Sequence, residues 1–549
     1  MKTWFKNLWA NASFKKIFLY LTGFFSGMSV MAIELGASRL MAPYFSSSQI
    51  VYTIIIGTVM IAMAIGNIIG GKMADKRSTP TKLFVLIFIA ACWICLIPVV
   101  GKFVIAGVAL GLAASSLSSN FLVWAAFLSC LLVFVFPLLI LGMVTPSLIK
   151  YAVGDLKNNG RVVGTIEAFG TIGSIIGTFI PTFVTIPFLG TSWNFIIFSI
   201  ILFLICLVYF FYAKKHRILF SVIDLFMITL AILGSKSSIS FMNNNTIYEG
   251  ESIYNYLRVE ETKDSYTLST NVLFGVQSVK MKEDGLTGLY YDTALAANSM
   301  VKDKDEPLDI LILGLGTGTF AYQTNHYCDN INGHANIDGV EIDSKIVSLA
   351  RKYFDLPENV NVHINDGRAY MNSNKKKYDI IMVDAYQDIT IPFQMSSIEF
   401  FRLVEKSLNP GGIMVVNMNM YTNNEGGIND YLSGTIKNVF NNVYTCKSNT
   451  NIELFACNDF DLKEELYNNI DKITDLDLMN KMMSIHSNLE YVSDQKAKYK
   501  LTDDKAQVEL LGMDVLDDMI FEELNYYREK LKGKSIKEII DMVNNGELF

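Results

Sequence analysis

Residues 1–235 contain nearly all of the long apolar runs of this 549-residue chain. A helix of about 20 apolar residues can cross the hydrocarbon core of a bilayer and keep its own backbone groups hydrogen-bonded there. We therefore predict an integral membrane domain over residues 1–235, with six to seven helices in contact with the lipid bilayer. The candidate spans lie at 17–42, 50–71, 82–101, 121–143, 162–189 and 193–213, followed by a weaker run at 218–234.

Positively charged residues predict which ends of these helices face the cytoplasm. Lysine and arginine precede the first run and follow the second, fourth and sixth, whereas the alternate loops carry almost no charge. Six crossings would leave both ends of the domain inside. The run at 218–234 is short and contains Asp224, which makes it marginal as a further crossing. We expect a multi-pass protein of the cell membrane whose catalytic half lies in the cytoplasm.

Two local patterns describe the architecture of the membrane domain further. The fifth run is rich in glycine, and small residues of this kind allow two membrane helices to pack closely. The segment from Gly70 to Arg77 resembles the short loop between the second and third helices of major-facilitator transporters. That resemblance implies a transporter-like helical domain.

Composition argues against two classes of function. The net charge of -7 and the pI of about 5.5 do not suit a protein that binds nucleic acid by neutralising phosphates. The five histidines form no ligand-spaced cluster with cysteine. Cys92 and Cys95 lie inside an apolar run, where cysteine behaves as a small buried hydrophobe. We predict neither a nucleic-acid partner nor a metal site.

Short apolar strands and helical stretches alternate in the second half of the chain. A glycine-rich turn, Gly314-Leu315-Gly316-Thr317-Gly318, follows the strand at 309–313. Glu341, Asp366 and Asp384 each stand where one of the next three strands ends. In an open parallel α/β sheet, ligands bind beyond the carboxyl ends of the strands. We therefore expect one backbone cradle and three carboxylates in a single pocket.

Three further domains are predicted beyond the membrane part. Residues 236–300 alternate apolar and polar positions between turn signals, which is typical of a small antiparallel β-domain. Residues 301–460 have the pattern of a Rossmann-like α/β domain. Residues 461–549 are acidic and have the pattern of a helical C-terminal extension.

Two fold classes share a glycine turn followed by an acid. In both, glycine allows backbone amides to approach a ligand, and Glu341 is placed to accept both hydroxyls of a ribose. Nicotinamide-binding folds account for these two features alone. With Asn365-Asp366-Gly367, Asp384 and the turn at Asn409-Pro410-Gly411-Gly412 added, the set resembles S-adenosylmethionine-type methyltransferase folds.

The chain resembles the spermidine synthase (polyamine aminopropyltransferase) family more closely still, and within it the branch that has a membrane domain fused ahead of the synthase domain. The likeness covers about residues 20–213 and 247–510. The segments that carry it are Ile33-Glu34-Leu35, Arg39 to Phe45, Gly250 to Tyr256, Gly275-Val276-Gln277-Ser278, Val340-Glu341-Ile342-Asp343, Asp366-Gly367-Arg368, Tyr378 to Tyr386 and Leu501 to Ala506.

That resemblance implies a reaction and a role for each matched residue. The co-substrate would be decarboxylated S-adenosylmethionine, and the nucleophile a primary amine of a polyamine such as putrescine. Asp384 would be the base, and Tyr290, Tyr291, Tyr386 and Asp388 would bind or orient the small amine. The residues implied for the co-substrate are Gln277 at the nucleoside, Gly314, Gly316 and Gly318 in the glycine turn, Glu341 at the ribose, and Asp366 with Gly367 at the adenine.

Two departures from the family pattern concern the amine rather than the co-substrate. Soluble synthases follow the catalytic aspartate with Ser-Ser-Asp-Pro, whereas this chain has Ala385-Tyr386-Gln387-Asp388, which moves the second acid by one residue. The usual Tyr-x-Glu-x-x-x-His stretch is reduced to Tyr290-Tyr291-Asp292, with Ala296 near the histidine position. The amine pocket is therefore the less well specified of the two.

Alternative functions remain open at this point. One is an S-adenosylmethionine-dependent methyltransferase that acts on a membrane-delivered acceptor. Another is a polyamine or nucleoside transporter or sensor with a non-catalytic soluble domain, although such a module has no need of a base at Asp384. The family likeness also allows a homodimer.

Overall fold

The computed structural model divides into two compact units. The helical unit contains residues 1–243 and 536–549, and the α/β unit contains residues 244–535. The residues that the structure describes are 12–45, 48–76, 79–114, 121–153, 159–213, 217–235, 245–271, 276–302, 306–331, 335–386, 391–419, 425–448, 451–513, 515, 529–530, 532–535, 538 and 542.

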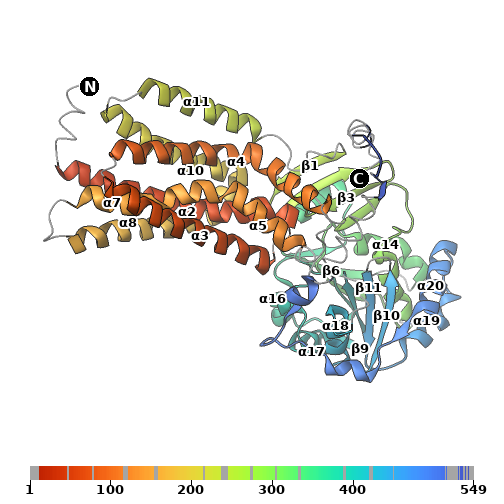
Figure 1. The fold of residues 1–549 in the computed structure, drawn as a ribbon. Helices are drawn as coiled ribbons and strands as arrows, with labels where there is room; N and C mark the ends of the chain where they lie inside the picture. Colours follow the sequence, from red (N-terminus) through yellow and green to blue (C-terminus); the bar gives the residue numbers. More distant parts are fainter. Residues whose placement is uncertain are drawn as a thin grey trace. The chain divides into compact units, whose positions relative to one another are not determined.

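Long apolar helices build the helical unit (Figure 1). Seven helices in the described part of this unit are long and apolar enough to cross a membrane. This agrees with the six to seven helices that the sequence predicts. The elements are α2 (Ala12–Phe45), α3 (Gln49–Asp75), α4 (Pro80–Ala114), α5 (Phe121–Val133), α6 (Val135–Gly142), α7 (Val144–Ala152), α8 (Asn159–Ile180), the π-helical turn η2 (Pro181–Thr185), α9 (Ile186–Leu189), α10 (Thr191–Ala213) and α11 (Arg217–Gly234).

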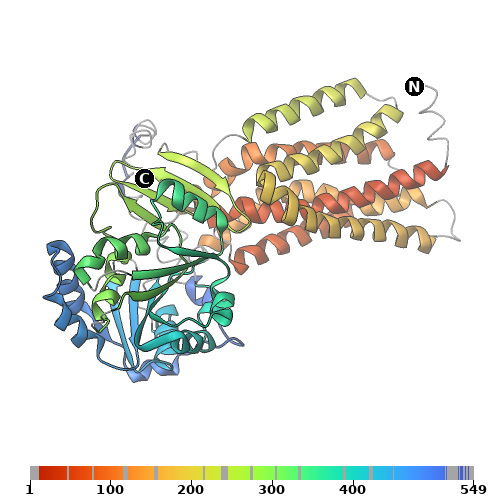
Figure 2. The ribbon, with the colours of Figure 1, turned by 180° about the vertical axis from the view of Figure 1, so that it is seen from behind.

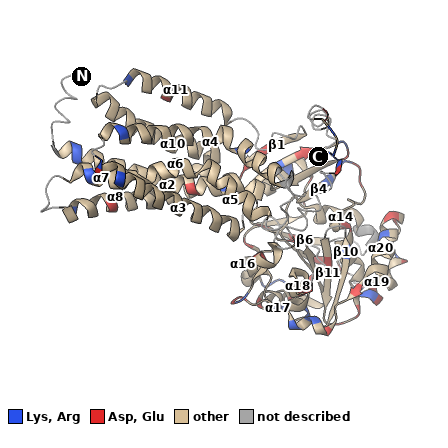
Figure 3. Cartoon of the chain, viewed as in Figure 1, with Lys and Arg blue, Asp and Glu red and all other residues tan. Residues whose placement is uncertain are grey.

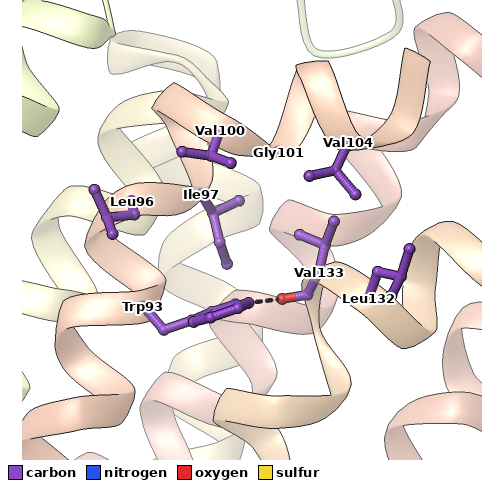
Figure 4. A pocket seen from close by; sticks show the side chains of 8 residues that line it. All are labelled: Trp93, Leu96, Ile97, Val100, Gly101, Val104, Leu132 and Val133. Atoms are coloured by element: carbon purple, nitrogen blue, oxygen red, sulfur yellow. Dashed lines mark hydrogen bonds between the residues drawn. The ribbon is translucent and has the colours of Figure 1, made fainter. Parts of the chain in front are cut away.

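The run expected to span the membrane at 121–143 is divided, because α5 ends at Val133 and a second helix, α6, begins at Val135. Pro137 has no N–H, so it cannot donate the usual helical hydrogen bond to the carbonyl of Val133. The indole Nε1 of Trp93 on α4 donates to that oxygen instead, at 2.8 Å, beside a small cavity of about 80 Å³ (Figure 4). The break therefore has a local chemical cause, and a tryptophan satisfies the exposed carbonyl.

Helix α11 corresponds to the marginal run at 218–234. It lies alongside α4 and α10 in both views (Figures 1 and 2), and its buried residues, Asp224 among them, face these neighbours. Lysine and arginine gather at one end of the helical unit, where α7 ends and α8 begins (Figure 3). There Lys150 on α7 pairs with Asp75 on α3 at 3.3 Å. The charge pattern thus gives the helical unit one positively charged end.

The α/β unit begins with a four-stranded antiparallel sheet, as the sequence predicts. Its strands are β1 (Thr246–Glu251), β2 (Tyr256–Glu261), β3 (Ser265–Ser269) and β4 (Ser278–Met281), in the order β1-β2-β3-β4. Two short helices, α12 (Tyr290–Ala294) and α13 (Ala296–Met300), then lead into the main sheet. Both helices are buried in the main core of the unit.

The main sheet has eight strands in the order β12-β10-β11-β9-β8-β5-β6-β7 (Figure 1). The five strands from β7 to β9 are parallel, and β11, β10 and β12 add antiparallel edges. The chain moves outward from β5 to β7 and then returns to β8 on the other side of β5, which creates a topological switch point. The strands are β5 (Leu308–Leu313), β6 (Ala335–Glu341), β7 (Asn361–Ile364), β8 (Tyr378–Val383), β9 (Leu408–Met418), β10 (Asn442–Ser448), β11 (Asn451–Cys457) and β12 (Glu490–Tyr491).

Helices cover this sheet in the manner of a Rossmann-like methyltransferase fold, so the predicted fold class is confirmed. The helices are α14 (Thr319–Ile331), α15 (Ser344–Tyr353), α16 (Gly367–Ser373), η3 (Phe393–Met395), α17 (Ile398–Ser407), α18 (Ile428–Lys437), α19 (Leu462–Ile470), α20 (Leu476–Asn488) and η4 (Asp494–Lys498). The expected helical extension after residue 461 begins with α19 and α20. It also contains β12, which the sequence pattern did not predict.

Candidate active site

A cavity of about 300 Å³ lies at the carboxyl ends of β5, β6 and β8. It is therefore at the topological switch point, where α/β sheets bind their ligands. The antiparallel sheet contributes a second wall, and the segment before α17 contributes a third. The lining residues are Tyr254, Asn255, Leu268, Thr270, Gln277, Ser278, Tyr291, Gly314, Leu315, Gly316, Val340, Glu341, Ile342, Ile346, Asn365, Asp366, Gly367, Asp384, Ala385, Tyr386, Pro392, Gln394 and Met395.

The glycine turn brings the backbone to the floor of the cavity. Gly314 has a φ of +87°, and a Cβ there would lie 2.4 Å from the carbonyl oxygen of Asp384. Only glycine fits both the left-handed backbone and this approach. Gly316 also lines the cavity, whereas Gly318 does not. Gly318 packs against Leu356 so closely that a Cβ would not fit there. The turn thus exposes backbone at Gly314 and Gly316 and uses Gly318 for packing.

Glu341 ends β6, and backbone amides hold it in place. Its Oε2 accepts from the N–H of Gly316 at 2.9 Å, and its Oε1 accepts from the N–H of Asp343 at 3.0 Å. Only 7% of the residue is exposed, and this burial raises the pKa of Glu341 to about 7. The two amides lower the pKa in turn, since they stabilise the carboxylate. The side chain is therefore preorganised, with lone pairs left to accept hydroxyl groups.

Asp366 stands at the start of α16, and Gly367 follows it in the cavity wall. Its Oδ1 accepts from the N–H of Ala369 at 2.8 Å, which caps the helix. Among the described residues, Oδ2 makes no hydrogen bond. Asp366 thus caps the helix with one carboxylate oxygen and also lines the cavity.

Asp384 follows β8, lines the cavity and is partly buried. The hydroxyl of Tyr290 donates to its Oδ2 at 2.7 Å, and the amide Nδ2 of Asn417 donates to its Oδ1 at 2.8 Å. Burial raises the pKa of Asp384 to about 7, although the two donors act in the opposite direction. A carboxyl whose pKa lies near neutrality can exchange a proton at physiological pH.

The tyrosines expected near the amine occupy three different positions. Tyr290 and Tyr291 stack with ring centroids 4.0 Å apart, and Tyr291 donates to the backbone oxygen of Gln277 at 2.7 Å. Tyr291 lines the cavity, whereas Tyr290 reaches the site through its bond to Asp384. Tyr386 lines the cavity, and its hydroxyl donates to the backbone oxygen of Asn417. Asp388 lies outside the described residues.

Two residues near Asp384 were not among the sequence candidates. Asn417 lies near the end of β9, and its Oδ1 accepts from Asn451 at 2.8 Å, which aims its Nδ2 at Asp384. Glu453 is paired opposite Asn417 in the sheet, is fully buried, and has no hydrogen-bond partner in the described part of the chain. Burial and the nearby Asp384 raise the pKa of Glu453 far above its usual range.

Both residues had a sequence signal. Asn417 directly follows the apolar run Ile413-Met414-Val415-Val416, so it occupies a strand end like the three acids. Glu453 is an acid inside the otherwise apolar strand β11. An unpaired charge is costly in such a strand and marks a functional candidate.

Comparison with known proteins shows which family has a similar sequence. Residues 289–454 match the family model of the spermine/spermidine synthase domain. The chain is similar to a probable polyamine aminopropyl transferase of Bifidobacterium longum, with 45% identity over 357 residues that cover 61% of this chain and 78% of the relative. It is also similar to a polyamine aminopropyltransferase of Vibrio vulnificus, with 27% identity over 218 residues that cover 38% and 70% of the two chains.

One solved structure with a similar fold is that of a probable spermidine synthase from Corynebacterium glutamicum. It has a TM-score of 0.37 and 19% identity, and the match covers 46% of this chain and 91% of that one.

The sheet order and the cavity at the strand ends define an α/β enzyme of the S-adenosylmethionine-dependent methyltransferase fold. The chain belongs to the polyamine aminopropyltransferase, or spermidine synthase, family. It is accordingly a transferase, and the described residues ahead of its catalytic unit include seven candidate membrane helices.

Proposed function

We propose that this chain is a membrane-anchored aminopropyltransferase. It moves an aminopropyl group from decarboxylated S-adenosylmethionine to a polyamine such as putrescine, and Asp384 is the base. The observation that carries this proposal is the partly buried Asp384 carboxyl, held by Tyr290 and Asn417 in the same cavity as the glycine turn and Glu341.

The nucleoside end of the cavity suits an adenosyl group. Gly314, Gly316 and Gln277 line this end of the cavity, and neither glycine has room for a Cβ against Asp384 or Ser278. Glu341 is fixed by two amides and can accept from both ribose hydroxyls. Asp366 has a free Oδ2 among the described contacts, which can accept from the adenine amino group. These residues bind and orient the nucleoside and exclude water from it.

The amine end suits proton removal. An amine that is protonated in solution must lose a proton before its nitrogen can attack the carbon next to the sulfonium. Asp384 accepts that proton, the new C–N bond forms, and the C–S bond breaks with its electron pair left on a neutral thioether sulfur. The Tyr290 hydroxyl and the Asn417 amide hold the carboxylate in one orientation for this step. Tyr291 and Tyr386, which line the cavity, orient the amine by contact.

Glu453 adds a second carboxyl near Asp384, and burial keeps it protonated while no cation is close to it. Its carboxyl is fully buried, lies close enough to raise the pKa of Tyr386, and lacks a cationic partner in the described chain. A diamine brings two ammonium groups, of which only one reacts. The other can compensate the buried carboxylate of Glu453, which is otherwise costly to ionise.

We also propose that the catalytic unit lies on the cytoplasmic side, where adenosine-derived co-substrates are made. The single positively charged end of the helical unit supports an inside N-terminus (Figure 3). A complete crossing by α11 would put the catalytic unit outside. Impermeant thiol labelling of single cysteines introduced at Lys76, Gly190 and Asn255 in intact cells measures the side of each. Labelling at Asn255 without permeabilisation would contradict the cytoplasmic assignment.

Mass spectrometry of products tests the activity. Purified full-length protein is incubated with decarboxylated S-adenosylmethionine or with S-adenosylmethionine, and with a panel of di- and triamines. The expected result is an amine heavier by one aminopropyl group, with 5′-methylthioadenosine as co-product. Methylation of an acceptor with only the carboxylated co-substrate would replace this proposal with a methyltransferase.

A further inference from the structure

The segment Leu501 to Lys505 contacts Arg368, the residue after the cavity-lining Gly367, although it lies well beyond the matched synthase domain, which ends at residue 454. It follows the turn η4 and makes a tight turn of its own, with Thr502 and Lys505 in a short bridge. The sequence pattern singles out this stretch, but the reaction described above uses none of its residues.

Asp503 forms a bidentate ion pair with Arg368 on α16. The two guanidinium nitrogens lie 2.7 and 2.6 Å from the two carboxylate oxygens. Arg368 Nη1 also donates to the backbone oxygen of Gln394 at 2.8 Å. Arg368 directly follows Asp366 and Gly367 in the chain. It therefore links their segment of the cavity wall to a second segment, which contains Gln394.

Other contacts anchor Asp503 itself. Ser397 donates to its Oδ1 at 2.5 Å, and its backbone N–H donates to Glu399 at 3.0 Å. The backbone oxygen of Leu501 accepts from Ile398 at 2.9 Å, and the N–H of Leu501 donates to Thr435 at 2.9 Å. Asp503 is therefore fixed to the first turn of α17 before it holds Arg368.

The two wall segments also touch each other. A Cβ on Gly367 would lie 3.1 Å from the methyl group of Met395, so a small shift of either segment changes the width of the cavity here. Arg368 and Asp503 do not line the cavity. Their pairing therefore acts on the ligand only through the wall.

We propose that Asp503 is a positioning residue that, through Arg368, fixes the Asp366–Gly367 wall against the Gln394–Met395 wall for the adenosyl part of a sulfonium nucleoside. The choice of ligand rests on the proposed function. The C-terminal segment 501–505 is thereby a working part of the nucleoside site, and the domain that matches the family is incomplete without it.

Calorimetry with 5′-methylthioadenosine tests the proposal on detergent-solubilised full-length protein. Asp503→Asn removes one half of a charge-assisted bidentate pair, so binding is expected to weaken about tenfold. Asp504→Asn is the matched control, since this neighbour is exposed and its side chain forms no hydrogen bond or ion pair within the described part of the chain. Equal affinities for the two variants would overturn the proposal, whatever the enzyme catalyses.

Kinetics separate positioning from a general loss of structure. In Asp503→Asn, the KM for the sulfonium co-substrate is expected to rise about tenfold, while kcat and the KM for the amine change less than about threefold. Arg368→Lys keeps the charge but loses the planar fork, so it should match Asp503→Asn. The double variant should be no weaker than the worse single one, because both break one contact. The proposal would be refuted if the effects of the two single variants added in the double variant. It would also be refuted if the two KM values rose by the same factor.

If Asp503→Asn lowers the melting temperature too far to assay, Ser397→Ala removes one of the hydrogen bonds to Asp503, together with the N-cap that Ser397 provides for α17. It should then weaken binding of 5′-methylthioadenosine by a smaller factor in the same direction. Unchanged binding in Ser397→Ala would count against the proposal. Absence of any aminopropyl product, with the binding differences intact, would instead overturn the proposed function alone.

Discussion

Glycine does different physical work in the two units of this protein. In the helical unit, a Cβ on Gly173 of α8 would lie 1.9 Å from the backbone oxygen of Phe24 on α2. In the α/β unit, Gly314 combines a φ of +87° with a carbonyl contact at the floor of the cavity. The first glycine lets two helices touch, as the sequence pattern predicts, and the second bends the chain at a binding site.

Buried polar groups differ in the same way. In the helical unit, Asn194 donates to the backbone oxygen of Ala32 at 2.8 Å and accepts from Thr185 at 2.7 Å, so these groups hold helices together. In the α/β unit, the buried acids Glu341 and Glu453 and the partly buried Asp384 lie near one cavity. Burial raises the pKa of each above its usual range. Such a concentration of perturbed carboxyls is typical of a catalytic site.

Among the variants considered, Asp384→Asn should have the largest effect, and the effect should be on catalysis. The amide is similar in size but cannot accept a proton, so kcat is expected to fall about 10²- to 10⁴-fold. The thioether product is measured under saturating substrates, and 5′-methylthioadenosine binding serves as the control for a folded site. A loss of less than about fivefold would remove Asp384 from the role of base.

Gly173→Leu should instead disrupt the packing between helices of the helical unit. The side chain cannot fit against Phe24, so the helical unit should lose about 1–3 kcal/mol or more of stability, seen as a lower melting temperature in detergent. Gly164→Leu on the same helix is the matched control, because a Cβ there meets nothing within 4 Å. If the two variants melt alike, close packing is not the role of Gly173.

The pH dependence of kcat/KM should report the ionisation of Asp384, because this ratio reflects the free enzyme. The pKa of Asp384 is about 7, so the carboxyl is neutral and inactive below that pH and becomes a competent carboxylate above it. The ratio should therefore fall about tenfold for each pH unit below this value. Asn417→Ala removes a donor that lowers the pKa, so the acid limb should move to higher pH. If the acid limb does not move, Asn417 has no effect on the pKa of Asp384.

Glu453→Gln should have the smallest effect and the most selective one. The KM for the amine is expected to rise about tenfold, the usual scale for loss of one charged contact, with little change in the KM of the sulfonium co-substrate. Gln is nearly isosteric, so the strand should keep its packing. Competition between a diamine and a monoamine gives a sharper measurement, because only the diamine should lose affinity. Equal losses for both amines would place Glu453 outside the amine site.

Much of the candidate site was predictable from local sequence. Gly314, Glu341, Asp366 and Asp384 follow apolar strands, and parallel strands end at one edge of a sheet, so their convergence follows from pattern and topology. Asn417 could have been added by the same rule. The break between α5 and α6, at Phe134, could not be predicted in this way. A proline in the sequence does not show whether a neighbour such as Trp93 will donate to the freed carbonyl.

The sequence by itself determined the two-part architecture, the fold class and the row of acids, because hydrophobic runs and strand periods are local properties of the chain. The tertiary structure alone decided which groups meet. Tyr290 reaches Asp384 across 94 positions, and Asp503 reaches Arg368 across 135. The unpartnered state of Glu453 depends on everything packed around it. Such contacts arise only when distant segments are brought together, because hydrogen-bond geometry and burial are not encoded in any one stretch.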